Sequence, residues 1–207
     1  DYSIMCGYQN DSGDDQTQGA IIGGNKNFNK ASNYSIISGQ QNYVNMSRSL
    51  VVGLKNGGAG GYLSGTDNII GGSSNQASAS DCNLLVGSGN SLANAGTDYN
   101  IIAGRTHGLL NSENNIIAGN NNDIPQSTST QPNGQGDNNL IVGSGNNSRY
   151  NGLVNNNIMY GLNNYFQSSS QTSNSLLGGL NSTLAGKSSV SIGGGNNLYT
   201  NATGSCL

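Results

Sequence analysis

One short unit, written twelve times along the chain, constrains the fold more than any other feature. The unit is clearest at residues 115–122, which read Asn-Ile-Ile-Ala-Gly-Asn-Asn-Asn. Self-similarity at a short period is typical of solenoids, in which each coil packs against its neighbours. The repeated glycine of the unit is found at Gly7, Gly24, Gly39, Gly53, Gly72, Gly87, Gly104, Gly119, Gly143, Gly161, Gly179 and Gly193.

The residues around this glycine indicate β-structure. The position three residues before it is aliphatic in all twelve copies, and the position three residues after it is Asn in ten. Successive glycines are 14 to 24 residues apart, which is too short for helical hairpin repeats of more than about 30 residues. Aliphatic doublets followed by Gly and Asn also disfavour a helix. We therefore predict a β-strand at each aliphatic core, followed by a glycine turn.

A second, shorter strand is predicted in most coils. In eight copies an apolar residue stands two places after the Asn or its substitute: Val44, Ala77, Leu92, Leu109, Ile124, Phe166, Leu184 and Leu198. The expected fold class is all-β, a parallel β-solenoid or β-roll of about twelve short coils. Residues 1–207 are expected to form a single β-solenoid repeat domain that is a segment of a longer fibrous chain.

Composition narrows the range of partners. Charged residues make up 8% of the chain and the net charge is -3, so a basic surface for nucleic acid is not expected. No apolar run reaches the roughly 18 residues that a membrane span needs. We expect neither nucleic-acid binding nor membrane insertion.

The second aliphatic residue of each core predicts an oligomer. Side chains alternate across a strand, so the first and second residues face opposite ways. With the first inside the roll, the second would form an apolar stripe too long for a soluble monomer to expose. We expect sister chains to cover it in a homotrimer; the alternative is cover from another wall of the same chain. The predicted interface residues are Ile22, Ile37, Val51, Ile70, Leu85, Ile102, Ile117, Ile141 and Leu177.

The repeated asparagines are expected to be structural. At a turn, Asn tolerates left-handed backbone conformations, and its amide can bond the equivalent Asn of the next coil. The alternative is an Asn array that binds sugar or ice.

The repeat resembles those of two groups of known proteins. The run Ser189-Val190-Ser191-Ile192-Gly193, followed by Asn196-Asn197-Leu198, resembles the head repeat of trimeric autotransporter adhesins, whose heads are trimers of left-handed parallel β-rolls. The commoner form, Asn-Ile-Ile-Gly-Gly-x-x-Asn at residues 68–75, is similar to Asn/Gly-rich repeats in phage tail fibres, particularly those of phages infecting marine cyanobacteria. The variable spacers and many asparagines favour the virion fibre, and neither family implies catalytic residues here.

Candidate chemical sites are few, and we expect no catalytic, cofactor-binding or metal-binding residue. Asp11, Asp14 and Asp15 could offer oxygens to Ca²⁺, but they lack the spacing of a known calcium loop. A solvated turn is the favoured interpretation. The one histidine, His107, stands where other coils carry Asn. Spacer tyrosines could stack on saccharides or on a protein, or cover coil edges; they are Tyr8, Tyr43, Tyr62, Tyr99, Tyr150, Tyr165 and Tyr199.

The longest insertion, from Ile124 to Asp137, holds both prolines and is expected to project from the solenoid. Its predicted ligand-contact residues are Pro125, Gln126, Thr128, Gln131 and Pro132. The expected function is a structural and adhesive segment of a trimeric, extracellular virion fibre that attaches to a host surface glycan or protein receptor. The alternatives are the head of a bacterial surface adhesin and a tailspike-type enzyme that degrades glycans.

Overall fold

The computed structural model describes the strands and most of the turns of the chain. The described residues are 3–12, 18–31, 33–57, 61–93, 97–110, 112–124, 137–149, 154–167, 172–173, 175–184, 188–195 and 197–198. None of them is helical, so no described helix could cross a membrane. The chain divides into two compact units, Asp1–Tyr99 and Asn100–Leu207, which are described separately; the single repeat domain stays a prediction.

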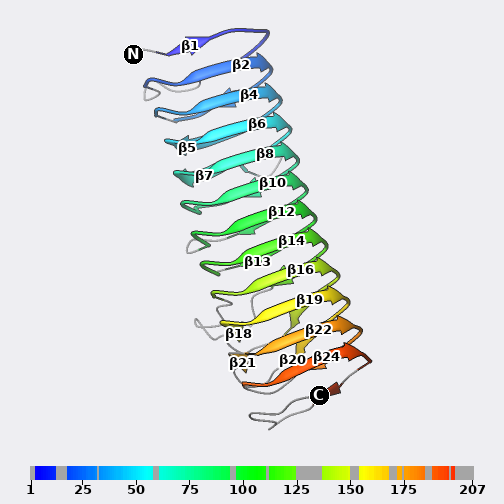
Figure 1. The fold of residues 1–207 in the computed structure, drawn as a ribbon. Helices are drawn as coiled ribbons and strands as arrows, with labels where there is room; N and C mark the ends of the chain where they lie inside the picture. The colour runs from blue at the N-terminus through cyan, green and yellow to red at the C-terminus, as the bar shows by residue number, and fades with distance from the viewer. Residues whose placement is uncertain are drawn as a thin grey trace. The chain divides into compact units, whose positions relative to one another are not determined.

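The twelve aliphatic cores form the first wall of the solenoid, six strands in each unit (Figure 1). Neighbouring strands are parallel and in register, with Ile21 opposite Ile36 and Gly24 opposite Gly39. The predicted all-β, parallel β-solenoid is therefore confirmed. The first unit contains β1 (Ile4–Met5), β2 (Ile21–Asn25), β4 (Ile36–Gln40), β6 (Leu50–Leu54), β8 (Ile69–Ser73) and β10 (Leu84–Ser88). The second contains β12 (Ile101–Arg105), β14 (Ile116–Asn120), β16 (Leu140–Ser144), β19 (Ile158–Leu162), β22 (Leu176–Leu180) and β24 (Val190–Gly194).

A second wall of shorter parallel strands follows the glycine turns. In the first unit it comprises β3 (Phe28–Asn29), β5 (Tyr43–Ser47) and β7 (Leu63–Thr66), and the pair β9 (Gln76–Ala77) and β11 (Ser91–Ala93). In the second unit it comprises β13 (Gly108–Leu110), β15 (Asp123–Ile124), β17 (Asn147–Arg149), β20 (Tyr165–Gln167), β23 (Thr183–Leu184) and β25 (Asn197–Leu198), with a separate pair β18 (Val154–Asn155) and β21 (Thr172–Ser173). All eight predicted second apolar residues lie in these strands, which confirms the second strand of those coils.

From β2 to β24 the second residue of each core faces the interior, so the predicted subunit interface is wrong; in the terminal strand β1 the corresponding Met5 is exposed. Each residue of the predicted interface is at most 1% exposed within the single chain: Ile22, Ile37, Val51, Ile70, Leu85, Ile102, Ile117, Ile141 and Leu177. The physical reason is the second wall, whose apolar side chains need partners across a thin roll. Val44, Leu92 and Phe166 supply that opposite layer and are equally buried. Burying each large aliphatic side chain stabilises the fold by about 1.5–3 kcal/mol.

A ladder of buried asparagine amides runs behind the glycine turns, as predicted. The side-chain N–H of Asn27 donates to the carbonyl oxygens of Gly23 at 2.7 Å and Gly39 at 3.0 Å. Its oxygen accepts from the backbone N–H of Asn42 at 3.1 Å and from the side-chain N–H at 2.9 Å. The left-handed residue is the one before each asparagine, for example Lys26 with φ 55°. The column therefore depends on its hydrogen bonds and not on the left-handed tolerance of Asn.

A second ladder stands just before each aliphatic core. The oxygen of Asn68 accepts from the backbone N–H of Asn83 at 2.9 Å and from its side-chain N–H at 3.2 Å. The same pattern joins Asn115 to Asn100 in the second unit. Because buried polar groups must be hydrogen-bonded, these two ladders let a chain with so many asparagines close a compact interior.

Candidate functional site

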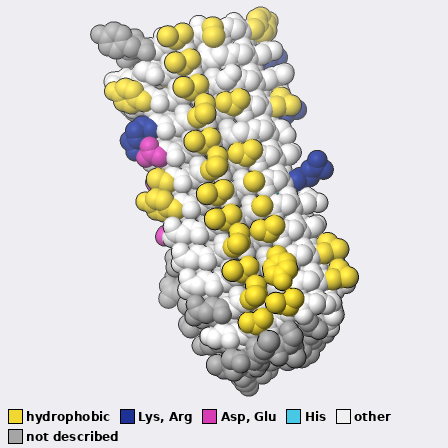
Figure 2. All heavy atoms as spheres, viewed as in Figure 1, with side chains coloured by type: hydrophobic (Ala, Val, Ile, Leu, Met, Phe, Trp, Pro, Cys, Tyr) yellow, Lys and Arg dark blue, Asp and Glu magenta, His cyan; other side chains and the backbone are white. Residues whose placement is uncertain are grey.

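The outer face of the first wall carries an exposed column of aliphatic side chains. It consists of the first residue of each core, which the sequence placed inside the roll. Ile69 is 49% exposed and Ile36 46% in the first unit, and Ile116 is 46% exposed in the second. Within each unit the hydrophobic side chains of this face follow one another across the strands (Figure 2). The apolar stripe expected from the sequence therefore exists, one residue earlier in each core.

The third residue of each strand widens this surface. These positions hold small or apolar side chains, among them Val52, Val86, Val142 and Ile192, all more than 40% exposed. Neither this column nor the first contains a charged residue. We call the two columns together the aliphatic face. The third column consists of Cys6, Gly23, Ser38, Val52, Gly71, Val86, Ala103, Ala118, Val142, Tyr160, Gly178 and Ile192.

The predicted contact loop lies between Ile124 and Asp137. Pro125, Gln126, Thr128, Gln131 and Pro132 all lie outside the described residues. Both flanks contact the solenoid: Ile124 ends β15 with its side chain buried, and a carboxylate oxygen of Asp137 accepts the Glu113 N–H at 2.8 Å. A ligand-contact role for the loop stays a prediction.

The acidic spacer is placed only in part. Asp14 and Asp15 lie outside the described residues, and Asp11 forms a bridge beside Phe28. Among the described residues no three acidic, histidine or cysteine side chains come together in a group that could hold a metal ion. The interpretation of the spacer as a solvated turn stays a prediction.

His107 fills a place in the asparagine ladder. It is 1% exposed, and its Nδ1 accepts the backbone N–H of Asn122 at 3.1 Å. With Nδ1 as acceptor, Nε2 carries the proton and donates to the carbonyl oxygen of Ala103 at 3.3 Å. The imidazole thus makes contacts equivalent to those of an asparagine amide, and its geometry gives it a structural role.

Two of the singled-out tyrosines come together with a phenylalanine on the second wall. The ring centroids of Phe28 and Tyr43 are 6.2 Å apart, those of Phe28 and Tyr62 5.7 Å, and those of Tyr43 and Tyr62 6.3 Å. The Lys30 ammonium lies 5.4 Å from the Tyr62 centroid. We call these three rings the aromatic cluster. Tyr8 and Tyr99 are exposed elsewhere, Tyr165 lies in β20, and Tyr150 and Tyr199 are outside the described residues.

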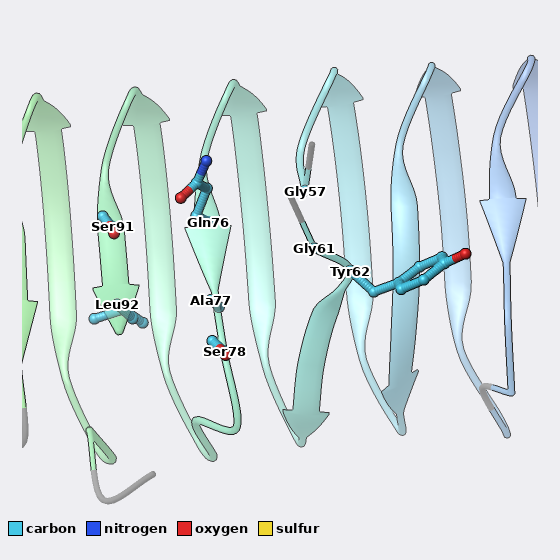
Figure 3. Close-up of a pocket in the computed structure, with 8 residues that line it drawn as sticks. All are labelled: Gly57, Gly61, Tyr62, Gln76, Ala77, Ser78, Ser91 and Leu92. Carbon is cyan, nitrogen blue, oxygen red and sulfur yellow. The ribbon is translucent and has the colours of Figure 1, made fainter. Parts of the chain in front are cut away.

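A hollow of about 220 Å³ adjoins the cluster along the same wall. Gln76, Ser78 and Ser91 line it with an amide and two hydroxyls, together with Ala77, Leu92 and two glycines (Figure 3). Tyr62 also contributes to the lining, while its ring extends away from Gln76 across the neighbouring coils (Figure 3). No carboxylate lines the hollow among the described residues. The repeat pattern does not predict the hollow, because it forms beside Gly57 and Gly61 of an irregular spacer.

The surroundings of the Asp123 carboxyl group shift its pKa. Partial burial raises the pKa of Asp123, and a hydrogen bond from the backbone of Gly108 partly opposes that rise. A carboxyl whose pKa is higher in the folded than in the unfolded state contributes stability at low pH and loses it as pH rises through the folded value. We therefore expect Asp123→Asn to raise the melting temperature at pH 7, and the gain to vanish below about pH 3, where an aspartate is protonated in either state.

Thermal unfolding followed by circular dichroism at several pH values checks this, with Asp11→Asn as the control for removing an exposed carboxylate. A gain for Asp123→Asn that persists at low pH would contradict the assignment to a buried charge.

The two surfaces that stand out are thus an uncharged aliphatic face on the first wall and an aromatic cluster with a hollow on the second. Both are built from ordered strands and lie on opposite walls of the roll. Comparisons with protein-family models, with curated proteins and with solved structures each found no match to the chain.

Proposed function

We propose that the chain is a structural and adhesive segment of a trimeric virion fibre, with the aliphatic face as its subunit interface. The observation that supports the proposal is that face: an uninterrupted aliphatic first column in each unit, flanked by a third column free of charge. The interface residues are therefore the first and third of each strand, and not the second.

An exposed surface of this kind needs cover. Six strands about 4.8 Å apart extend a column over about 24 Å in each unit. Contiguous apolar patches on soluble monomers are usually small, and larger ones mark interaction sites. Isolated apolar residues would need no explanation, but a column filled in every strand of the wall does.

Sister chains are the partner that fits best. The side chains of the aliphatic face repeat with the spacing of the coils. The aliphatic face of a parallel sister chain has the same spacing, so the two can contact each other coil by coil. Most soluble oligomers are symmetric homo-oligomers. Three rolls around a common axis would turn the aliphatic face of each inward and leave the second wall outside.

The outer surfaces would then carry the adhesive role. The second wall, on which β15 ends at Ile124 directly before the long insertion, remains accessible in such an assembly. A host surface glycan or protein is the proposed receptor. Placement in an extracellular fibre follows from the resemblance of the repeats and not from the fold. The bacterial adhesin head is an alternative with the same assembly, whereas a tailspike-type enzyme would need a cleft with paired carboxylates.

The test is the mass of the particle in solution, measured by light scattering for the wild type and for Ile36→Asp. An aspartate at the centre of the aliphatic face would bury a charge at the interface, so we expect a trimer to become a monomer. Gln40→Asp is the matched control, because it adds the same charge on the same strand at an exposed polar position.

The control should remain a trimer. A wild-type monomer, or a trimer that survives Ile36→Asp, would overturn the proposed assembly. Circular dichroism of both variants checks that the fold is kept.

A further inference from the structure

We propose that the aromatic cluster and the adjoining hollow form one binding site for an oligosaccharide of pyranose sugars. The site is composed of Phe28, Tyr43 and Tyr62 on one side and Gln76, Ser78 and Ser91 on the other. This inference deepens the adhesive part of the proposed function by naming the class of ligand. It does not depend on how many chains assemble.

The rings form a platform at the surface and not part of the interior. Tyr43 is 40% exposed and Tyr62 36%, while Val44 and Leu63, their chain neighbours on the inward side, are fully buried. The platform is assembled from three different coils, because Phe28 pairs with Tyr43 and the next strand begins directly after Tyr62. The interior is thus closed beneath the rings, which leaves their outer surfaces open for a ligand.

The chemistry of this surface matches a pyranose ring. A sugar ring has a face of C–H groups and a rim of hydroxyls, so it needs an apolar plane beside hydrogen-bonding groups. Aromatic rings attract the weakly positive C–H groups through their negative faces. The amide of Gln76 and the hydroxyls of Ser78 and Ser91 offer both donors and acceptors to sugar hydroxyls. Ligand sites are typically concave and mostly apolar, with a few polar groups that fix orientation.

The arrangement favours a chain of sugars over a single one. The hollow and the cluster are neighbours along the coil stack, because Tyr62 lines the hollow and also contacts Phe28 and Tyr43. The Tyr62 ring extends away from Gln76 (Figure 3). A sugar stacked on the tyrosines would therefore place its neighbour over Gln76 and Ser91. The charged side chain of Lys30 contacts the platform at Tyr62, and its ammonium can donate to a ring or hydroxyl oxygen.

The site also lies where a fibre would present it. The aromatic cluster is on the outer face of the second wall, formed by β3, β5 and β7, and the aliphatic face is on the first wall. Burying the aliphatic face between subunits would leave the cluster in solvent. Each coil stack could then hold a glycan at its periphery.

Saturation-transfer NMR on the full chain tests the site directly. The probes are cellotetraose, maltotetraose and chitotetraose, with sorbitol as a polyol that has hydroxyls but no ring face. We expect transfer to the ring C–H protons of at least one tetrasaccharide and none to sorbitol. Tyr62→Ala should lower the transfer at least fivefold, Tyr62→Phe should keep it, and Gln76→Ala should weaken it.

Tyr34→Ala is the matched control, since Tyr34 is an exposed tyrosine in the same unit, 67% exposed and outside the cluster. The inference would be overturned if none of the three tetrasaccharides received transfer, or if sorbitol received as much transfer as they do. It would also be overturned if Tyr34→Ala lowered the transfer as much as Tyr62→Ala. The same conclusion would follow if transfer were lost only in variants that circular dichroism shows to be unfolded. Light scattering on the same samples reads the assembly separately, so failure of the glycan site and failure of the trimer are distinguishable.

Discussion

Replacing Gly72 with alanine is expected to destabilise the solenoid by at least about 3 kcal/mol. Gly72 has φ +106°, a conformation that side-chain-bearing residues rarely adopt, and forcing one there costs about 1–3 kcal/mol. An added methyl group would also overlap the carbonyl oxygen of Gly87 in the next coil. Neighbouring coils would have to separate and lose ladder hydrogen bonds. Urea unfolding followed by circular dichroism measures the loss.

The adjacent Gly71 provides a matched control within β8. It has no positive φ, and a methyl group built on it meets no atom within 4 Å. Gly71→Ala should therefore be neutral or stabilise the fold by a few tenths of a kcal/mol, because alanine restricts the unfolded chain. Equal effects of the two substitutions would contradict the close approach of the coils at the repeated glycine.

Replacing Asn42 with alanine is expected to cost about 3 kcal/mol. The Asn42 amide oxygen accepts two hydrogen bonds from Asn56, each at 3.0 Å. Its side-chain N–H group donates to the Asn27 amide oxygen at 2.9 Å and to the Gly53 carbonyl at 3.0 Å. The substitution leaves these buried partners unsatisfied, at about 1–3 kcal/mol for each group that finds no water.

Gln40→Ala, an exposed change in the same coil, controls for the loss of an amide and should fall within about 0.5 kcal/mol of the wild type. Asn42→Ser should cost less than Asn42→Ala, because the hydroxyl of a serine keeps one donor in the ladder, as Ser182 does in its own coil by donating to the Gly193 carbonyl oxygen at 3.3 Å. A small effect of Asn42→Ala in urea unfolding would mean that the ladder contributes little to stability.

The repeat pattern alone was enough to predict the fold class. The aliphatic doublets, the glycine and the asparagine recur together, and each has one physical role in a stacked coil. The second wall could be predicted too, since residues such as Leu92 and Phe166 keep a fixed distance from the asparagine. The stacked amides followed from the same register.

The two residues of the aliphatic doublet do not themselves indicate which one faces the interior, because both are aliphatic. Their neighbours carried the missing information. The residue before the doublet is Asn or Ser in eleven of twelve copies and shares a face with the second aliphatic residue. The third residue, on the face of the first, ranges from Gly71 to Tyr160. An interior keeps a nearly constant volume, so a position that accepts both glycine and tyrosine belongs outside.

The candidate binding surface was harder to predict. Tyr62 belongs to an irregular spacer, so its position beside Phe28 depends on the path of that spacer and not on the repeat. The hollow has the same origin, since it forms beside Gly57 and Gly61.

Cysteine cross-linking tests the central claim most directly, namely that the first residue of each core faces outward and meets its counterparts in sister chains. In a variant with Cys6, Cys82 and Cys206 replaced by serine, Ile69→Cys and Ile70→Cys place a thiol on adjacent residues of β8. Mild oxidation should give disulfide-linked chains for Ile69→Cys, whereas the thiol of Ile70→Cys should stay reduced until the protein is unfolded. Linkage through residue 70 and not through residue 69, or through neither, would contradict this account.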